Sequence, residues 1–315
     1  MTLIVAQSAG VDISKDSLDA HLHPAGRRRR FSNDAKGCAA LIAWLGDVTV
    51  ARIAFEPTGA YHHAFERRLA AAGLPLVKVN PRQARRFAEA LGQNAKTDPI
   101  DADLLARFAA LLEPPVRPVV SAALDTMKEL HIARRALVKD RVAALNREST
   151  RRSALLKRQA RERLRQIDRQ IAAIDAALRV ELSADPALEA RFDILQSIPG
   201  IGAATALAIL IEMPELGAIE HRSAASLAGL APIARDSGRT RGKRFIRGGR
   251  AQLRHALYMP ALVAARCNPQ LKAKYEALRA AGKPPKVAIT AVMRKILILA
   301  NALLRDRRTW TPGLA

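Results

Sequence analysis

The sequence predicts an α/β domain at the N-terminus, a helical connector and a mainly α-helical C-terminal domain. Three observations lead to this prediction. Residues 3–112 alternate short apolar runs with stretches of helical spacing, which indicates strands interleaved with helices. A proline cluster lies at 114–118, and residues 121–182 contain neither glycine nor proline. We therefore divide the chain into residues 1–113, 114–190 and 191–315.

Each element of the first domain has a local reason. Runs rich in Val and Ile, or alternating apolar with polar residues, predict strands. Helices are indicated by three- to four-residue spacing, and Pro99 suits a first helical turn. We expect strands at 3–13, 17–23, 49–55 and 76–79, and helices at 35–45, 61–72, 81–91 and 98–112.

The connector begins where Pro114, Pro115 and Pro118 prevent a helix from continuing. Beyond them, Leu, Ile and Ala recur every three or four places among Arg, Gln and Glu, which predicts one or two long amphipathic helices and favours a coiled coil. The polar side is strongly basic, so it is either a solvated face or a contact with nucleic-acid backbone. In the last part of the chain we expect helices at 203–211, 223–228, 249–267, 269–280 and 285–305.

The composition points to a polyanionic partner. Among 315 residues, Lys and Arg number 52 against 29 Asp and Glu, a formal net charge of +23. Such a charge repels itself unless nucleic acid lies against it. The two cysteines, Cys38 and Cys267, are too far apart to suggest a zinc site. We expect a cytoplasmic, nucleoid-associated protein with no membrane partner, because the run at 203–211 is too short to span a bilayer.

Four carboxylates in the first domain form the candidate metal site. Asp12 lies at the end of the first predicted strand, Glu56 follows the strand at 49–55, and Asp98 and Asp101 share one face at the start of a helix. Oxygen ligands of this kind suit one or two Mg²⁺ ions, which would stabilise the attacking and leaving oxygens of a phosphodiester. Taken singly, Asp98 also fits a helix cap and Asp12 a turn. The order of the acids on this background is the layout of a ribonuclease-H-like fold. Lys15 and Lys96 flank the acids and are candidate phosphate contacts.

The second candidate region is rich in glycine and arginine. The segment 196–202 ahead of an apolar helix suits a helix-hairpin-helix turn, in which Gly200 and Gly202 would present backbone amides to a phosphate. A simple helix–helix turn fits it as well. Further on, Ser237 lies in a loop whose glycines allow close approach to a phosphate. Asp-Ser-Gly is also an ordinary turn sequence. The basic candidates for nucleic-acid contact are Arg235, Arg239, Arg241, Lys243, Arg244 and Arg250.

Five motifs together resemble a known family. They are Gly10–Lys15, Glu56–Gly59 with Tyr61 and His62, Lys96–Ala102, Ile198–Gly202, and Arg235–Gly238 with Gly248–Arg250. Their residues and order are similar to those of the DEDD transposases of the insertion-sequence family numbered one hundred and ten, which are related to the pilin-gene invertases. The match covers nearly the whole chain.

The resemblance implies a RuvC-like N-terminal domain in which Asp12, Glu56, Asp98 and Asp101 bind Mg²⁺. It further implies a coiled-coil connector and a C-terminal transposase domain in which Ser237 becomes covalently linked to a DNA end as phosphoserine. Members of this family use a structured noncoding RNA, the bridge RNA, to pair with donor and target DNA, which would suit the excess positive charge. They act as homodimers that assemble into tetramers, with the acids and the serine supplied by different subunits.

Two alternatives remain open from the sequence. A junction-resolving nuclease would use metal-bound water, and Ser237 would be only a turn residue. A basic architectural protein would clamp DNA without catalysis, and the acids would be structural. A recombinase forms a covalent protein–DNA adduct through Ser237, whereas a nuclease does not. A recombinase also depends on the acids for its activity on DNA, whereas an architectural protein does not.

Overall fold

The structure is a computed structural model that describes residues 6–57, 59, 61–93, 98–116, 121–238 and 240–312, without the side chains of residues 98–100 and 240. The chain forms two compact units, residues 1–119 and residues 120–315. The boundary follows the proline cluster, where the sequence predicts a linker.

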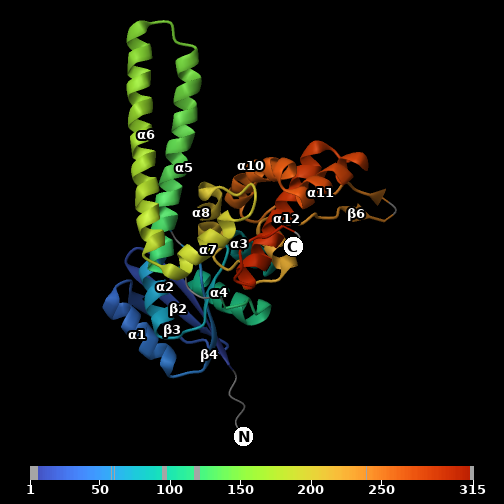
Figure 1. The fold of residues 1–315 in the computed structure, drawn as a ribbon. Coiled ribbons are helices and arrows are strands. Elements are labelled where there is room, and N and C mark those ends of the chain that lie inside the picture. The colour runs from blue at the N-terminus through green and yellow to red at the C-terminus, as the bar shows by residue number, and fades with distance from the viewer. Residues whose placement is uncertain are drawn as a thin grey trace. The chain divides into compact units, whose positions relative to one another are not determined.

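The first unit is built on a five-stranded sheet (Figure 1). Its strand order is β3-β2-β1-β4-β5. The first three strands form an antiparallel meander, and β4 and β5 continue the sheet parallel to β1. The strands are β1 (Gln7–Ile13), β2 (Ser17–His23), β3 (Arg28–Ser32), β4 (Val50–Phe55) and β5 (Leu76–Lys78).

Helices cover both faces of this sheet because side chains alternate along each strand. In β1, Ala9, Val11 and Ile13 pack with α1 and α2, while Ala54 of β4 packs with α3 and α4 on the other face. The helices are α1 (Ala35–Gly46), α2 (His62–Ala71), α3 (Pro81–Ala90) and α4 (Asp98–Leu112). These are the elements that the sequence predicts, which confirms a mixed α/β domain.

The strand β3 is the element that the sequence analysis misses. Of its residues, Phe31 alone is buried, and Arg28, Arg29 and Arg30 are exposed. Apolar alternation cannot identify a strand with one inward side chain. Arginines are well suited to the edge of a sheet, because their charge opposes pairing with another strand.

Helix α4 lies directly against the strand that carries the first acid. A Cβ on Gly10 would collide with backbone atoms of Ala102 and Ala106. Asp103 anchors the same helix: its carboxylate lies 2.7 Å from His21 Nδ1 of β2 and 3.1 Å from Arg107 Nε. The contact with His21 ties α4, which also carries Asp101, to the sheet, while the pair with Arg107 lies within the helix.

Gly10→Ala should therefore destabilise the first unit by about 3 kcal/mol, since the added methyl group must push α4 off β1. Thermal unfolding of the purified protein measures this change. Gly46→Ala is the matched control, because a Cβ there meets open space. Equal melting temperatures for the two variants would contradict the close approach of β1 and α4.

The second unit begins with two long helices, α5 (Ala122–Ser149) and α6 (Ala154–Ser183), which fold back on one another (Figure 1). Ala144, Leu164 and Ile167 form a small core between them. Ion pairs from Arg134 to Asp175 and from Arg141 to Asp168 link the helices along their length. The prediction of one or two long amphipathic helices here is confirmed, and there are two.

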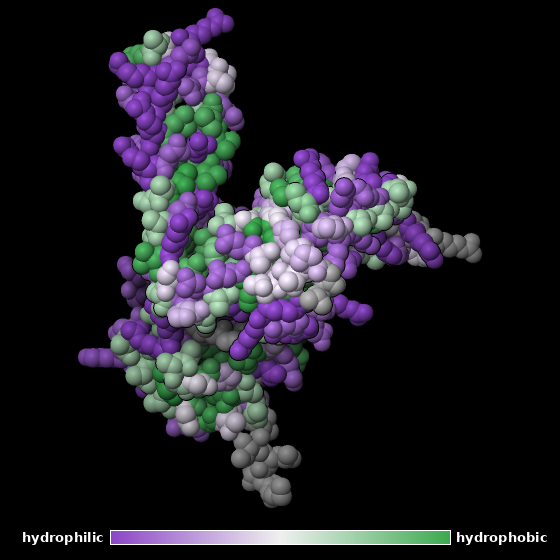
Figure 2. Space-filling view, in the orientation of Figure 1, coloured by the Kyte–Doolittle hydropathy of each residue, from purple (hydrophilic) through white to green (hydrophobic). Residues whose placement is uncertain are grey.

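The surface of the α5–α6 hairpin carries both hydrophilic and hydrophobic side chains. On the face shown in Figure 2, hydrophilic side chains cover the turn end and hydrophobic ones line part of the shaft. Helix α5 exposes Val138, Val142 and Leu145 to solvent. These residues lie about one helical turn apart, so together they form an apolar stripe.

The rest of the second unit is a helical body with a large apolar core. Helices α8 to α12 fall where the sequence predicts helices, and α7 is an additional helix that precedes the Gly200 turn. The helices are α7 (Pro186–Gln196), α8 (Ala203–Glu212), α9 (His221–Leu227), α10 (Ala251–Cys267), α11 (Pro269–Ala280) and α12 (Pro285–Arg305).

Helix α12 is long and apolar enough to cross a membrane by length and composition. More than half of its apolar window is buried. Ile289, Val292, Ile296 and Leu303 are all part of the core of this unit. Helix α12 thus has the environment of a central core helix.

His131 of α5 gives the second unit a pH-dependent stability. It is buried, and burial together with the charges of Arg135 and Arg134 lowers its pKa from 6.5 to about 4. Below pH 6.5 the unfolded chain takes up a proton that the folded chain refuses, so stability falls as the pH falls towards 4. We expect a loss of about 2 kcal/mol at pH 5 relative to pH 7.5 from this residue.

Urea unfolding at the two pH values tests this prediction in the wild type and in His131→Gln. The variant should lose less stability on acidification than the wild type. An identical loss in the two proteins would show that His131 does not carry the effect.

Candidate functional site

The first two acids lie at the carboxyl ends of neighbouring parallel strands. In the register of β1 and β4, Val11 pairs with Phe55, so Asp12 and Glu56 follow side by side. Asp12 lies on the same face of β1 as Gly10, which is the face that α4 covers. Both acids are therefore directed to the α4 side of the sheet.

A pocket of about 350 Å³ brings three of the four acids together. Asp12, Glu56 and Asp101 line it, and each is partly exposed. Asp98 begins α4, one turn before Asp101, and its side chain lies outside the described residues, as does the whole of Lys96. The pocket can hold a divalent cation, because it offers carboxylate oxygens from two strands and a helix.

Helix α3 forms the other wall of this carboxylate pocket. Its lining includes Ala84, Arg85, Ala88 and, just beyond the helix, Gln93. Arg85 is ion-paired with Glu89 at 3.2 Å. The side-chain oxygen of Gln93 is buried and has no hydrogen-bond partner among the residues that the structure describes. Arg85 could offer positive charge to a phosphate and Gln93 a neutral acceptor, and the sequence analysis misses both.

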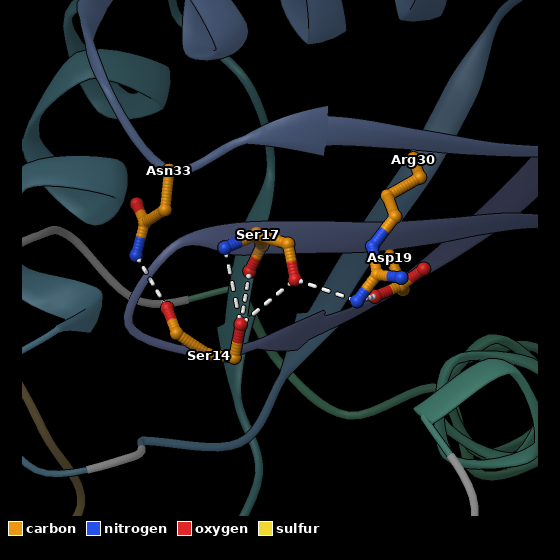
Figure 3. A network of polar contacts seen from close by, with 5 residues as sticks. All are labelled: Ser14, Ser17, Asp19, Arg30 and Asn33. Carbon is orange, nitrogen blue, oxygen red and sulfur yellow. Dashed lines mark hydrogen bonds and ion pairs between the residues drawn. The ribbon is translucent and has the colours of Figure 1, made fainter.

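The turn after Asp12 is held by a network of polar contacts (Figure 3). Ser14 Oγ accepts a hydrogen bond from the backbone N–H of Ser17 at 3.0 Å and lies 2.8 Å from Ser17 Oγ. Asn33 donates to the carbonyl of Ser14 at 2.8 Å, and Arg30 donates to Ser17 Oγ at 2.9 Å. The network fixes the end of β1, and it leaves Lys15 exposed at the turn, where it can reach a phosphate.

Ser237 lies in the second unit, on a small β-hairpin that projects from the helical body (Figure 1). Strand β6 (Asp236–Ser237) pairs with β7 (Thr240–Arg241), and Ile233 bridges to Phe245 at the base. Gly238 turns the chain with φ +52°. Ser237 is exposed at the end of this hairpin.

Asp236 organises the Ser237 hairpin. Its carboxylate accepts hydrogen bonds from the backbone N–H of Gly242 at 3.1 Å and from Arg244 Nη1 at 2.9 Å. A Cβ on Gly242 would collide with the carbonyl of Arg235, so the two sides of the hairpin approach closely. The side chains of Arg235, Arg241, Lys243 and Arg244 are exposed around it, and Arg239 lies outside the described residues.

Arg250, which the sequence predicts to contact nucleic acid, is partly buried and is paired within the protein. Its guanidinium donates to both carboxylate oxygens of Glu215, at 2.5 and 3.0 Å, and to the carbonyl of Glu212 at 2.6 Å. A bidentate pair of this kind fixes the start of α10 to the segment after α8. Arg250 therefore helps to hold the helical body together, and its contact with nucleic acid stays a prediction.

The segment between α7 and α8 is a turn that joins two helices, which fits both a helix-hairpin-helix element and a simple helix–helix turn. Gly200 adopts φ +99°. A Cβ added to it would lie 3.0 Å from the carbonyl oxygen of Pro260 in α10. Gly202 caps α8 with its backbone alone and is exposed. Close packing explains glycine at 200, and a phosphate contact at Gly202 stays a prediction.

Comparison with known proteins identifies relatives along the whole chain. Residues 9–174 match the IS110 DEDD transposase family, and residues 192–276 match the family described as Transposase IS116/IS110/IS902. The chain is 30% identical to a pilin gene-inverting protein of Moraxella lacunata over 95% of its own length and 96% of that protein. A pilin gene-inverting protein of Moraxella bovis is 29% identical over the same shares. An insertion element IS110 protein of Streptomyces coelicolor is 31% identical over 42% of this chain and 33% of its own. The chain therefore belongs to the IS110 family of DEDD transposases, and it is a DNA transposase or recombinase.

Proposed function

We propose that this protein moves an insertion sequence by cutting and rejoining DNA strands through a covalent phosphoserine at Ser237. Asp12, Glu56, Asp98 and Asp101 would hold Mg²⁺ in a RuvC-like, ribonuclease-H-like domain. The observation that carries the proposal is the carboxylate pocket, where Asp12, Glu56 and Asp101 come together. The bound ions would supply Lewis-acid stabilisation of the phosphate.

The chain's own residues have distinct roles in this reaction. Ser237 Oγ attacks the phosphorus, its proton is lost, and the ester bond to one DNA oxygen breaks as that oxygen takes up a proton. Arg235 and Arg241, exposed beside Ser237, would stabilise the charge on the phosphate. Attack by a second DNA hydroxyl on the phosphoserine would rejoin the strand and restore Ser237, so the reaction needs no external energy source.

The proposed assembly would bring residues of the two units to one phosphate. The acids belong to the first unit and Ser237 to the second, and we propose that they meet on one phosphate through a homodimer that assembles into a tetramer on DNA. The apolar stripe of Val138, Val142 and Leu145 supports this, because a second copy could cover it. The hairpin of α5 and α6 would then act as a coiled-coil connector at 114–190, between domains at 1–113 and 191–315.

We further propose that a structured bridge RNA guides the protein to donor and target DNA in the cytoplasm, at the nucleoid, and that no membrane is involved. The charge of +23 supports a second nucleic-acid partner. Lys15, Lys96, Gly200, Gly202, Arg235, Arg239, Arg241, Lys243 and Arg244 would contact the nucleic acids.

Recombination in cells tests the proposed function. A plasmid that carries the gene with its flanking DNA should yield rearranged plasmid, and sequencing of RNA bound to the purified protein should recover one RNA from the flanking DNA. Deletion of that RNA should stop rearrangement. Continued rearrangement without the RNA would remove the guide from the proposal and leave the recombinase.

A further inference from the structure

A second group of metal-ligand side chains lies outside the carboxylate pocket, in the first turns of α2. His62, His63 and Glu66 each offer one ligand atom, and these atoms all lie within 4.8 Å of one another. His62 and Glu66 are buried, and His63 is partly buried. The ring of His62 lies 6.2 Å from that of Phe55, which belongs to the core under α1 and α2. The cluster is thus on the opposite face of the sheet from the pocket of Asp12.

We propose that His62, His63 and Glu66 form a binding site for a transition-metal dication of the zinc class. Two imidazoles and one carboxylate are a ligand set that zinc accepts, whereas Mg²⁺ prefers oxygen ligands alone. In a tetrahedral zinc site with bonds of about 2.1 Å, ligand atoms lie roughly 3.4 Å apart. Side-chain rotation is enough to close the observed group to this spacing, and water would occupy the fourth position.

The two histidine rings lie close enough together to bind one metal ion. Their centroids are 4.2 Å apart with an angle of 30° between the planes, so the two rings stack beside one another. A histidine binds a metal through an unprotonated ring nitrogen, and each of the two rings offers one nitrogen to the group.

Lys78 competes with a metal for the carboxylate of this cluster. Its Nζ lies 2.7 Å from Glu66 Oε2, and His62 Nε2 lies 3.8 Å from the same oxygen. The Lys78 side chain is 41% exposed, so it can leave Glu66 for solvent when a metal binds. Removal of this competing charge should strengthen metal binding, which a purely structural ion pair would not do.

Titration with Zn²⁺ and Co²⁺ tests the site in the full-length protein. Asp12→Asn and Asp101→Asn are introduced first, so that the carboxylate pocket does not contribute. We expect one bound ion in calorimetry and, with Co²⁺, the intense visible absorption of a four-coordinate site. His63→Ala and Glu66→Gln should each weaken binding at least about tenfold. Lys78→Met should strengthen it, and His221→Ala, at an exposed histidine, should change nothing.

The outcome does not depend on DNA recombination, since only metal binding and absorption are measured. Circular dichroism establishes that each variant is folded. If His63→Ala misfolds, the metal affinity of Lys78→Met still tests the proposal, because that variant keeps all three ligand side chains. No binding, binding that Glu66→Gln leaves unchanged, or binding that Lys78→Met fails to strengthen would overturn the proposal.

Discussion

Asp101→Asn is expected to reduce DNA strand cleavage by at least about three orders of magnitude, equivalent to roughly 4 kcal/mol of transition-state stabilisation. Asp101 lines the carboxylate pocket with Asp12 and Glu56. An amide keeps the shape of the side chain but removes the charge that holds a divalent cation. Cleavage of a labelled DNA substrate that carries the element's ends, with saturating RNA and Mg²⁺, measures the effect.

Two controls make this result specific. Asp16→Asn changes an exposed acid in the turn after β1 and should cleave as the wild type does. Mn²⁺ is less strict than Mg²⁺ about its ligands. Partial recovery of DNA cleavage by Asp101→Asn in Mn²⁺ would therefore support a metal-ligand role for Asp101. If Asp101→Asn cleaves at the wild-type rate, Asp101 does not hold the catalytic metal, and the carboxylate pocket is not the cleavage site.

Ser237→Ala is expected to lower recombination by at least about four orders of magnitude, because alanine has no oxygen with which to form the covalent phosphoester. Ser237 is exposed on its hairpin and is not part of the core, so its loss should not unfold the domain. Quantitative amplification of rearranged plasmid from cells measures recombination over this range.

The exposed serine Ser223 provides the matched control, and Ser223→Ala should recombine normally. A junction-resolving nuclease makes a different prediction for Ser237→Ala, since attack by water needs no serine. Undiminished cleavage by that variant, with free DNA ends, would favour the nuclease and exclude the phosphoserine.

The carboxylate pocket could be expected from sequence because its geometry follows from simple rules. Asp12 and Glu56 each end a strand, and parallel neighbouring strands end at the same edge of a sheet. Asp101 follows from the close approach of α4 to Gly10, whose need for glycine is visible only in the structure.

Other parts of the site depend on tertiary contacts that no local pattern reports. Arg85 and Gln93 line the pocket because α3 packs beside α4, and neither belongs to a motif. In the sequence, Arg250 belongs to a run of arginines that are mostly exposed. In the structure its guanidinium is paired with Glu215, which lies 35 residues away along the chain. Charge patterns identify a basic surface but cannot say which of its arginines are already paired.

Mass spectrometry of the protein trapped on DNA is the most direct test of whether Ser237 and the acids act on the same phosphate. After reaction with Mg²⁺ and nuclease digestion, a nucleotide should remain on the peptide that contains Ser237, and it should be absent from the Asp101→Asn protein. A nucleotide on a different residue, or an unmodified protein beside cut DNA, would contradict this mechanism.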